Sequence, residues 1–123
     1  MRSEATEENE VFTFEENLKK ATTEFLLLQL ISQKPCYIGE LAEQIHIQSC
    51  GALQIVFPYA AIYRLLQAGY IYELEKRIAP DGRKRQYYFI TVTGIVHLQR
   101  LQNAYTRFTN GVANLLDKGG TLL

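Results

Sequence analysis

The chain has 123 residues, of which 47% are hydrophobic and 21% are charged, so it has the composition of one ordinary globular domain and not of a collagen-like, disulfide-scaffold or wholly disordered protein. Its thirteen basic and thirteen acidic side chains cancel to a formal charge of zero, which by itself argues against a nucleic-acid-binding protein. The charges are unevenly placed: residues 1–75 hold eleven acidic and five basic side chains (−6), whereas residues 76–118 hold two acidic and eight basic ones (+6). This asymmetry indicates a polyanionic partner for one face.

Several classes of protein find no support in the sequence. The longest largely apolar run, residues 25–31, is far shorter than the roughly 20 residues that cross a bilayer. The acidic N-terminus does not resemble a secretory signal, so we expect a cytoplasmic protein. Cys36 and Cys50 match no zinc or redox motif, and we expect both to remain reduced thiols. His46 and His97 have no nucleophile motif beside them. We therefore expect no enzyme, no metal and no cofactor.

Three helices are predicted in the first half of the chain. Residues 1–13 are polar and acidic and are expected to form a flexible tail. From Phe14 onward, apolar residues recur at helical spacing until Pro35 stops the helix. The same spacing predicts a short second helix over residues 38–46. A third is expected over residues 55–68, with a proline tolerated in its first turn and a glycine at its C-terminal cap.

A β-hairpin and a long helix are predicted in the second half. Residues 70–77 and 86–90 are rich in strand formers, and the Ala79-Pro80-Asp81-Gly82 segment between them is typical of a turn. The hairpin tip is basic, because Arg83, Lys84 and Arg85 follow the turn directly. The final helix is expected over residues 92–117, followed by a flexible tail over residues 118–123.

The final helix carries the most regular apolar pattern in the sequence. Its seam, spaced alternately by three and four residues, consists of Leu98, Leu101, Tyr105, Phe108, Val112 and Leu115. A strict stripe on a helix this long favours a homodimer contact over packing within the chain, which is the alternative. We expect the N-terminal helix of the other subunit, through Phe14 and Leu18, to complete this interface.

The order of the elements predicts the fold. Three helices, a two-stranded hairpin with a basic tip and a further helix form a mostly α (α+β) winged helix-turn-helix domain. We expect the winged domain to span residues 14–91 and the dimerisation helix residues 92–117. In such folds the third helix enters the major groove of double-stranded DNA and the wing lies along phosphates.

Two segments resemble the PadR-like family of winged helix-turn-helix transcriptional regulators. Residues 53–59 occupy the place of the family's opening to the third helix, and the following family positions are matched by Ala61, Ile62, Arg64, Leu65, Gly69 and Ile71. The return strand of the wing is the more specific match: a basic run, a tyrosine pair and a Thr-x-x-Gly element lie within residues 83–94. The resemblance covers roughly residues 20–116. It implies a homodimeric repressor that binds a pseudo-palindromic operator.

Each candidate site residue has a plainer alternative role. Arg83, Lys84 and Arg85 are expected to contact phosphates, or else to form a solvated charged turn. On the third helix, bases or backbone are expected to be contacted by Tyr59, Tyr63, Arg64 and Gln67, for which partly buried packing is an equal alternative. The resemblance also implies an effector cleft at the dimer centre. Tyr105, where small members of the family often have tryptophan, and Phe108 would line it, unless they only pack in the seam.

The sequence thus predicts a sequence-specific DNA-binding regulator, a repressor relieved by a small aromatic or hydrophobic effector. A winged-helix protein-interaction module that does not bind DNA is the main alternative, favoured by the acidic N-terminal segment and the apolar start of the third helix. An RNA-binding or structural dimer is a third possibility, although no aromatic RNA-binding signature supports it.

Overall fold

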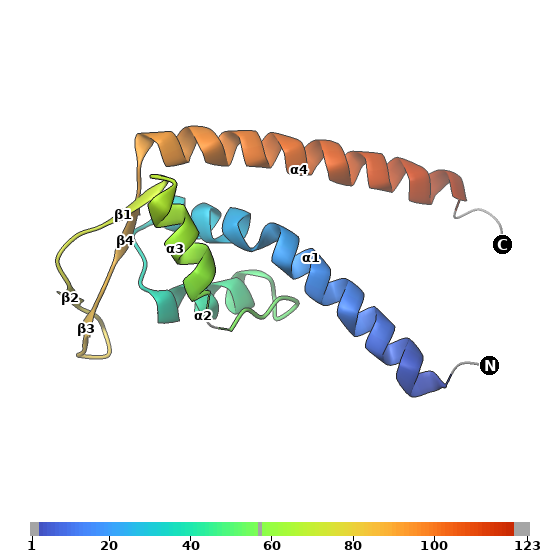
Figure 1. Ribbon diagram of the computed structural model, residues 1–123, viewed down its shortest axis with the longest axis horizontal. Coiled ribbons are helices and arrows are strands. Elements are labelled where there is room, and N and C mark those ends of the chain that lie inside the picture. The colour runs from blue at the N-terminus through green and yellow to red at the C-terminus, as the bar shows by residue number, and fades with distance from the viewer. Residues whose placement is uncertain (1–2, 57, 120–123) are drawn as a thin grey trace.

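The computed structural model of the chain describes residues 3–56 and 58–119, so Phe57 and the end of the predicted C-terminal tail lie outside the described residues. The elements in chain order are α1 (Glu4–Gln33), α2 (Ile38–Gln48), α3 (Tyr59–Gln67), β1 (Ile71–Glu73), β2 (Arg77–Ile78), β3 (Lys84–Arg85), β4 (Tyr88–Ile90) and α4 (Val92–Gly119). Figure 1 shows the short helices and the wing gathered at one end of two long helices. The predicted winged helix-turn-helix fold is confirmed.

Helix α1 begins at Glu4, and the start predicted near Phe14 is wrong. The Ser3 side chain caps the helix by accepting a hydrogen bond from the backbone N–H of Thr6 (3.2 Å), and Glu4 and Glu7 lie in the first turn, where the helix dipole favours acidic side chains. Residues 4–13, expected as a tail, are therefore helical. They are exposed on all sides, so no apolar stripe marks this part of the helix in the sequence.

Helix α3 is shorter than predicted at its start. Pro58 is its N-cap, and residues 53–56 are not helical, so the start expected at Ile55 is wrong. Because proline has no backbone N–H, it cannot donate the hydrogen bond that would continue a helix from the residues before it, so the proline marks the start of the helix. The C-terminus follows the prediction: Gly69 adopts a positive φ of 78°, and the N–H of Tyr70 donates to the carbonyl of Leu65 (3.0 Å).

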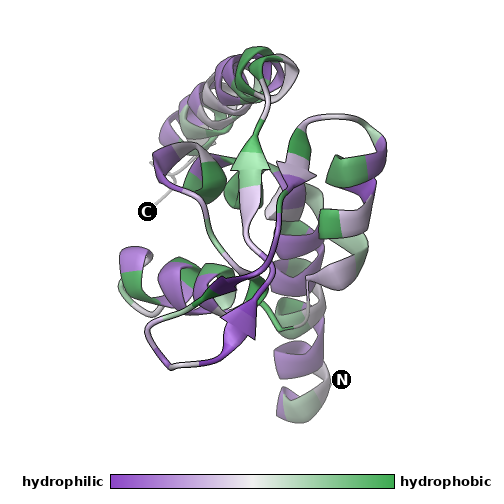
Figure 2. Cartoon of the chain, turned by 90° about the vertical axis from the view of Figure 1, so that its left-hand side faces the viewer, coloured by the Kyte–Doolittle hydropathy of each residue, from purple (hydrophilic) through white to green (hydrophobic). Residues whose placement is uncertain are grey.

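The wing is one hairpin made of two short ladders. At its base β1 pairs with β4, with Ile71 opposite Ile90 and Glu73 opposite Tyr88. Farther out β2 pairs with β3, and the tip is closed by Gly82 at a φ of 84°. The predicted hairpin is confirmed. Figure 2 shows that its outer part is mainly hydrophilic, whereas β4 at its base is hydrophobic.

The core lies where α1, α2, α3, the base of the wing and the first half of α4 meet. Its buried side chains are Leu27, Leu28, Leu30, Ile31, Cys36, Leu41, Ile45, Ile62, Leu65, Ile71, Tyr88 and Leu98. The segment after α1 joins the wing directly, because Cys36 and Tyr88 exchange two backbone hydrogen bonds (3.2 and 2.8 Å). The helix-turn-helix unit and the wing thus share one core, which fixes the orientation of α3 relative to the hairpin.

The start of α4 is tied to the end of α3. The Thr91 hydroxyl donates to the carbonyl of Gly69 (2.7 Å) and accepts from the N–H of Gly94 (2.9 Å). Gly94 lies so close to the end of α3 that a Cβ there would stand 2.1 Å from the carbonyl oxygen of Tyr70. Beyond this junction α4 follows α1 for a few turns and then diverges from it (Figure 1).

Candidate nucleic-acid interface

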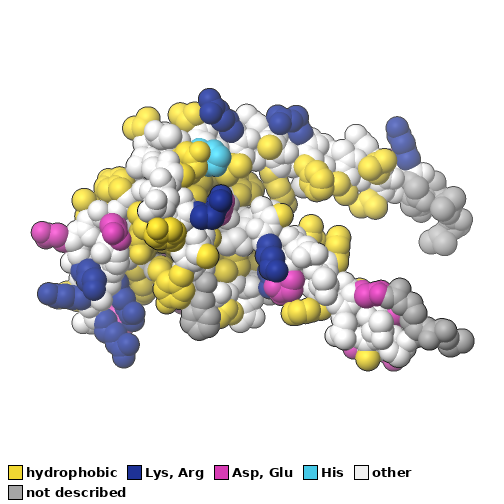
Figure 3. Space-filling view, in the orientation of Figure 1, with side chains coloured by type: hydrophobic (Ala, Val, Ile, Leu, Met, Phe, Trp, Pro, Cys, Tyr) yellow, Lys and Arg dark blue, Asp and Glu magenta, His cyan; other side chains and the backbone are white. Residues whose placement is uncertain are grey.

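The basic tip of the wing offers two unpaired cations. Arg83 and Lys84 are exposed, and neither has an ion-pair partner within residues 3–56 and 58–119. Figure 3 shows Lys and Arg side chains gathered at this end of the molecule. Because unpaired surface cations are free to replace the counterions of a polyanion, this tip suits a phosphate backbone.

Arg85, the third predicted phosphate contact, is engaged within the wing. Its Nη2 donates to Oδ2 of Asp81 (2.6 Å), and its guanidinium lies 5.5 Å from the ring centre of Tyr37. The hydrogen bond from Arg85, together with that from the backbone N–H of Arg83, holds the pKa of the Asp81 carboxyl below its usual value. Arg85 therefore docks the wing against the start of α2, and its charge is partly neutralised.

A further arginine on the wing was missed by the sequence reasoning. Arg77 on β2 is exposed, and its guanidinium lies 4.8 Å from the ring centre of Phe89 and 5.7 Å from that of Tyr87. Phe89 in turn stacks on Tyr72, with ring centres 5.2 Å apart. These rings hold the guanidinium over the hairpin. The sequence shows only that Arg77 lies between two strands rich in aromatic residues. Whether the guanidinium meets the rings depends on the strand register, which the sequence alone does not give.

The outer face of α3 is aromatic rather than charged. Tyr59 and Tyr63 are 57% and 63% exposed, and Ala60 and Gln67 are also exposed, whereas Ile62 and Leu65 are buried in the core. The alternative of partly buried packing therefore stays beside the predicted DNA contact, and the larger part of each side chain lies at the surface.

Arg64, the one cation of α3, is held by α1. Its Nε and Nη2 donate to the two carboxylate oxygens of Glu24, with 2.9 Å between Nη2 and Oε2. The Glu24 carboxylate raises the pKa of the arginine through this hydrogen bond and through its charge. The planar fork of the guanidinium is thus occupied by a bidentate contact. Arg64 was predicted to contact DNA together with Tyr59 and Tyr63. In the structure its guanidinium is paired with Glu24 instead.

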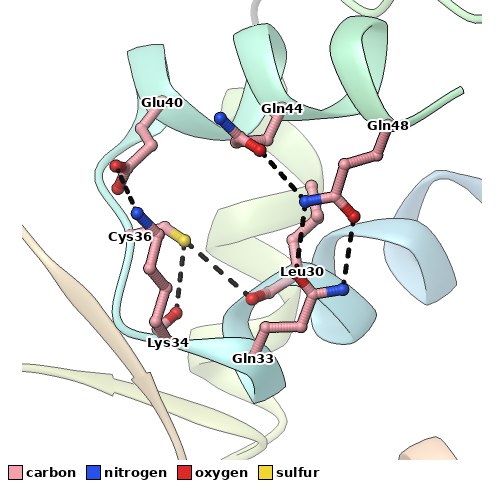
Figure 4. A network of polar contacts seen from close by, with 7 residues as sticks. All are labelled: Leu30, Gln33, Lys34, Cys36, Glu40, Gln44 and Gln48. Atoms are coloured by element: carbon pink, nitrogen blue, oxygen red, sulfur yellow. Dashed lines mark hydrogen bonds and ion pairs between the residues drawn. The ribbon is translucent and has the colours of Figure 1, made fainter. Parts of the chain in front are cut away.

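The polar contacts around Cys36 join the end of α1 to the start of α2 (Figure 4). Lys34 donates from Nζ to Oε2 of Glu40 (3.1 Å), and the Cys36 thiol donates to the carbonyl of Lys34 (3.2 Å). Burial, with a contribution from the nearby Glu40 charge, raises the pKa of Cys36 to about 12. The thiol therefore stays protonated and inert at neutral pH.

Three glutamine side chains extend this junction along α2. The amide of Gln48 exchanges hydrogen bonds with that of Gln33 (3.2 and 3.3 Å) and donates to Oε1 of Gln44 (3.0 Å). The contacts fix α2 across the end of α1, so they help to set the position of the helix-turn-helix unit.

No group of His, Cys, Asp and Glu side chains suited to a metal ion occurs within the described residues. Nor is any helix among them long and apolar enough to cross a membrane.

A groove of about 830 Å³ lies between α1 and α4 where the two helices separate. Its walls include both residues predicted to bind an effector, Tyr105 and Phe108, together with Leu18 and Phe25. At its inner end the rings of Phe25 and Tyr105 are in contact, with centres 5.4 Å apart. Figure 3 shows hydrophobic side chains on the facing sides of the two diverging helices.

The residues of the predicted dimer seam divide into two groups. Leu98 is 5% exposed and belongs to the core of its own chain, and Leu101 packs against that core, so these two residues have an intramolecular role. The residues farther from the core include large exposed side chains: Phe14, Leu18, Tyr105, Phe108 and Leu115 are between 47% and 74% exposed. Val112 lies among them with intermediate exposure.

Comparison with known proteins identifies similar structures. No family model matches the sequence, and no curated protein matches it. A PadR-like transcriptional regulator from Bacillus cereus is 25% identical, with a TM-score of 0.70 over 81% of this chain and 96% of the other. A PadR-family regulator from Eggerthella lenta is 20% identical, with a TM-score of 0.76 over 91% and 96%. A transcriptional regulator from Clostridium thermocellum is 24% identical, with a TM-score of 0.69 over 80% and 92%.

Proposed function

We propose that this chain, which has the winged-helix fold of PadR-like transcriptional regulators, is a sequence-specific DNA-binding repressor that acts as a homodimer. The observation that carries the proposal is a pair of unpaired cations on the wing, Arg83 and Lys84. The wing packs on the same core as α3, so these cations keep a fixed position relative to the exposed face of α3. In winged helix-turn-helix proteins the recognition helix enters the major groove while flanking parts contact the backbone. The arrangement suits double-stranded DNA.

The paired state of Arg85 changes the expected electrostatics of binding. Three cations per wing would give a slope of log K against log salt of about −5 for a dimer, since each neutralised phosphate contributes about −0.9. With Arg85 held by Asp81, two of the three predicted contacts, Arg83 and Lys84, remain without an ion pair in each subunit, and their contribution to the slope becomes about −4. The wing then supplies moderate, salt-sensitive affinity, and the dimer doubles the number of phosphate contacts.

The exposed apolar surface of the long helices supports the homodimer. Large apolar side chains exposed on α1 and α4 line an open groove, and such a patch is unusual on a monomer. The first half of α1 is acidic, whereas the outward half of α4 carries Arg107 and Lys118. These opposite charges favour a second copy as the occupant, with its α1 lying along α4.

The groove also suits a small effector. In the proposed dimer the second copy takes up part of this groove, and the rings of Phe25, Tyr105 and Phe108 beside it offer stacking surfaces for a flat aromatic or hydrophobic molecule. Because α1 and α4 form its walls, a bound effector would change their separation in the dimer and with it the spacing of the two α3 helices. Induction would then be a population shift between DNA-competent and incompetent dimers.

A mobility-shift titration tests the DNA-binding proposal. The wild-type chain is compared with Arg83→Ala/Lys84→Ala on the DNA upstream of its own gene, at low and moderate salt. Lys20→Ala/Arg100→Ala is the matched control, because it removes two exposed cations from the long helices, outside the wing, instead. We expect specific binding that is lost or strongly weakened only in the wing variant. An equal loss in both variants would show that net charge, and not the wing, governs binding.

A protein-interaction module without DNA binding is the second candidate. The exposed tyrosines of α3, with Val56 just before the helix at 62% exposed, also suit an apolar protein partner. Absence of binding to any duplex, even at low salt, would favour this function over the repressor.

A panel of aromatic compounds tests the effector. We expect at least one compound to change operator affinity, and Tyr105→Ala to abolish that change. No change with any compound would remove this part of the proposal.

A further inference from the structure

Apart from the hydroxyl groups of Tyr59 and Tyr63, the face that α3 offers to a partner has little capacity for hydrogen-bond readout of bases. In the part of α3 nearest its N-terminus, which in helix-turn-helix proteins contacts base edges, the exposed side chains are Tyr59, Ala60 and Tyr63. The sequence before it contributes another exposed apolar side chain, Val56. Amide groups are confined to Gln67 at the other end of the helix and to Gln54 in the preceding loop.

The usual guanine-reading group is occupied elsewhere. Guanine is most often recognised by an arginine whose fork reaches O6 and N7. Arg64 uses that fork to bind both carboxylate oxygens of Glu24. Arg64 also follows Tyr63 in the second half of α3, and its side chain is directed to Glu24 of α1. The part of α3 that enters the groove first is therefore without a cation.

Only one base offers an apolar group in the major groove. Thymine carries a 5-methyl group there, and small or aromatic side chains such as alanine contact it favourably. Ala60 and Tyr63 are three positions apart and so lie next to each other on the same face of α3. Alanine leaves room for close approach of the helix, and the tyrosine ring supplies apolar area beside it.

Building on the DNA-binding function proposed above, we propose that α3 selects its operator by contact of Ala60 and Tyr63 with thymine 5-methyl groups. The specificity of each half-site then depends on the position of one or two thymines, and hydrogen-bond readout contributes little. Affinity for the backbone comes separately from Arg83 and Lys84 on the wing. Sequence preference and salt dependence are thus carried by different parts of the molecule.

Uracil, which is thymine without the 5-methyl group, provides the test. Duplexes that bind the full-length protein are first selected from a randomised library at moderate salt. The best duplex is then resynthesised with uracil in place of each thymine in turn, and its affinity is measured by fluorescence anisotropy. Since burying one methyl-sized group is worth about a fourfold change in affinity, we expect about fourfold weaker binding at one or two positions in each half-site and no change elsewhere.

Substitutions assign the methyl contacts to α3. In Tyr63→Ser and Ala60→Ser the uracil penalty should disappear at the position that each residue reads, whereas Tyr63→Phe should retain it. Arg83→Ala is the matched control, because it should weaken thymine and uracil duplexes by the same factor. Circular dichroism and thermal unfolding verify that each variant is folded. Ala60→Ser removes no ring, so it supplies the assignment even where Tyr63→Ser abolishes binding.

Each result decides the proposal. Equal binding of thymine and uracil duplexes at every position would overturn it, and the repressor function would stand with another mode of readout. A full penalty that persists in both serine variants would also overturn it, because the methyl groups would then be read elsewhere or through DNA shape. Failure to select any duplex from the library would instead reject DNA binding itself, and the readout with it.

Discussion

Arg64 of α3 and Glu24 of α1 form a bidentate ion pair that joins the proposed recognition helix to the helix lining the apolar groove. Glu24 directly precedes Phe25, whose ring contacts Tyr105 across that groove. The same turn of α1 therefore contacts α3 on one side and the groove on the other. A shift of α1 on ligand binding would be transmitted to α3 through this pair.

Replacing Glu24 with glutamine is expected to increase affinity for DNA at low salt. The change removes the acceptor pair of Arg64 and leaves a cation on α3 without its counter-charge. One added phosphate contact in each subunit would steepen the slope of log K against log salt by about 2. A salt titration of binding to a fixed duplex measures the slope.

The control for this experiment is Glu8→Gln, which removes one negative charge from an exposed site of the same helix. It should leave the slope near that of the wild type. If the two variants gave the same slope, release of Arg64 would not be the cause.

The close approach at the start of α4 predicts opposite effects for two glycine-to-alanine substitutions. A Cβ at Gly94 would stand 2.1 Å from the carbonyl oxygen of Tyr70 and 2.8 Å from Cγ1 of Ile90, so the helix must move away from the end of α3. We expect Gly94→Ala to lower the free energy of unfolding by about 2 kcal/mol or more. A Cβ at Gly111 would meet nothing within 4 Å among the described residues beyond its own helix backbone, and Gly111→Ala should raise the free energy of unfolding by up to about 1 kcal/mol.

Urea unfolding followed by circular dichroism measures both changes, at one fixed protein concentration because a dimer is stabilised by mass action. Equal stability of Gly94→Ala and the wild type would show that the junction between α3 and α4 is loosely packed.

The buried thiol of Cys36 predicts a loss of stability in alkaline solution. Burial, with the Glu40 charge, raises the pKa of this thiol from 9.0 to about 12 in the folded chain. Between these two values the unfolded chain has lost the proton and the folded chain retains it, so the contribution is complete below pH 9 and declines as the pH rises toward 12. The free energy of unfolding should therefore fall more steeply above pH 9 in the wild type than in Cys36→Ala.

Cys50 is the control for the alkaline experiment, because it is exposed and Cys50→Ala should leave the pH profile unchanged. Thiol labelling of the native wild type at pH 8 should modify Cys50 quickly and Cys36 only on unfolding. Rapid labelling of both thiols would contradict the burial of Cys36.

Local signals made most of the fold predictable from the sequence. Pro35 and Gly69 mark helix ends, and the Pro80-Asp81-Gly82 segment marks the hairpin turn, because each acts through its own backbone geometry. Contacts between distant residues were not predictable in this way. Arg64 is paired with a residue forty positions earlier, so only the folded chain shows that this candidate DNA contact is engaged. Arg77 meets the rings of Tyr87 and Phe89 through strand register, so only the folded chain adds it to the wing surface.

The apolar groove between the long helices predicts that loss of one large side chain of α4 weakens the dimer. Phe108 is 65% exposed and lines the groove, so Phe108→Ser should remove apolar area from the proposed interface and weaken dimerisation by about 2 kcal/mol or more. Leu116 is the matched control, because it is 68% exposed on the same helix but is not part of the seam, and Leu116→Ser should not change the association constant. Sedimentation equilibrium measures the monomer–dimer ratio of each variant. A wild type that remains monomeric at high micromolar concentration, or equal weakening by both substitutions, would contradict the proposed interface.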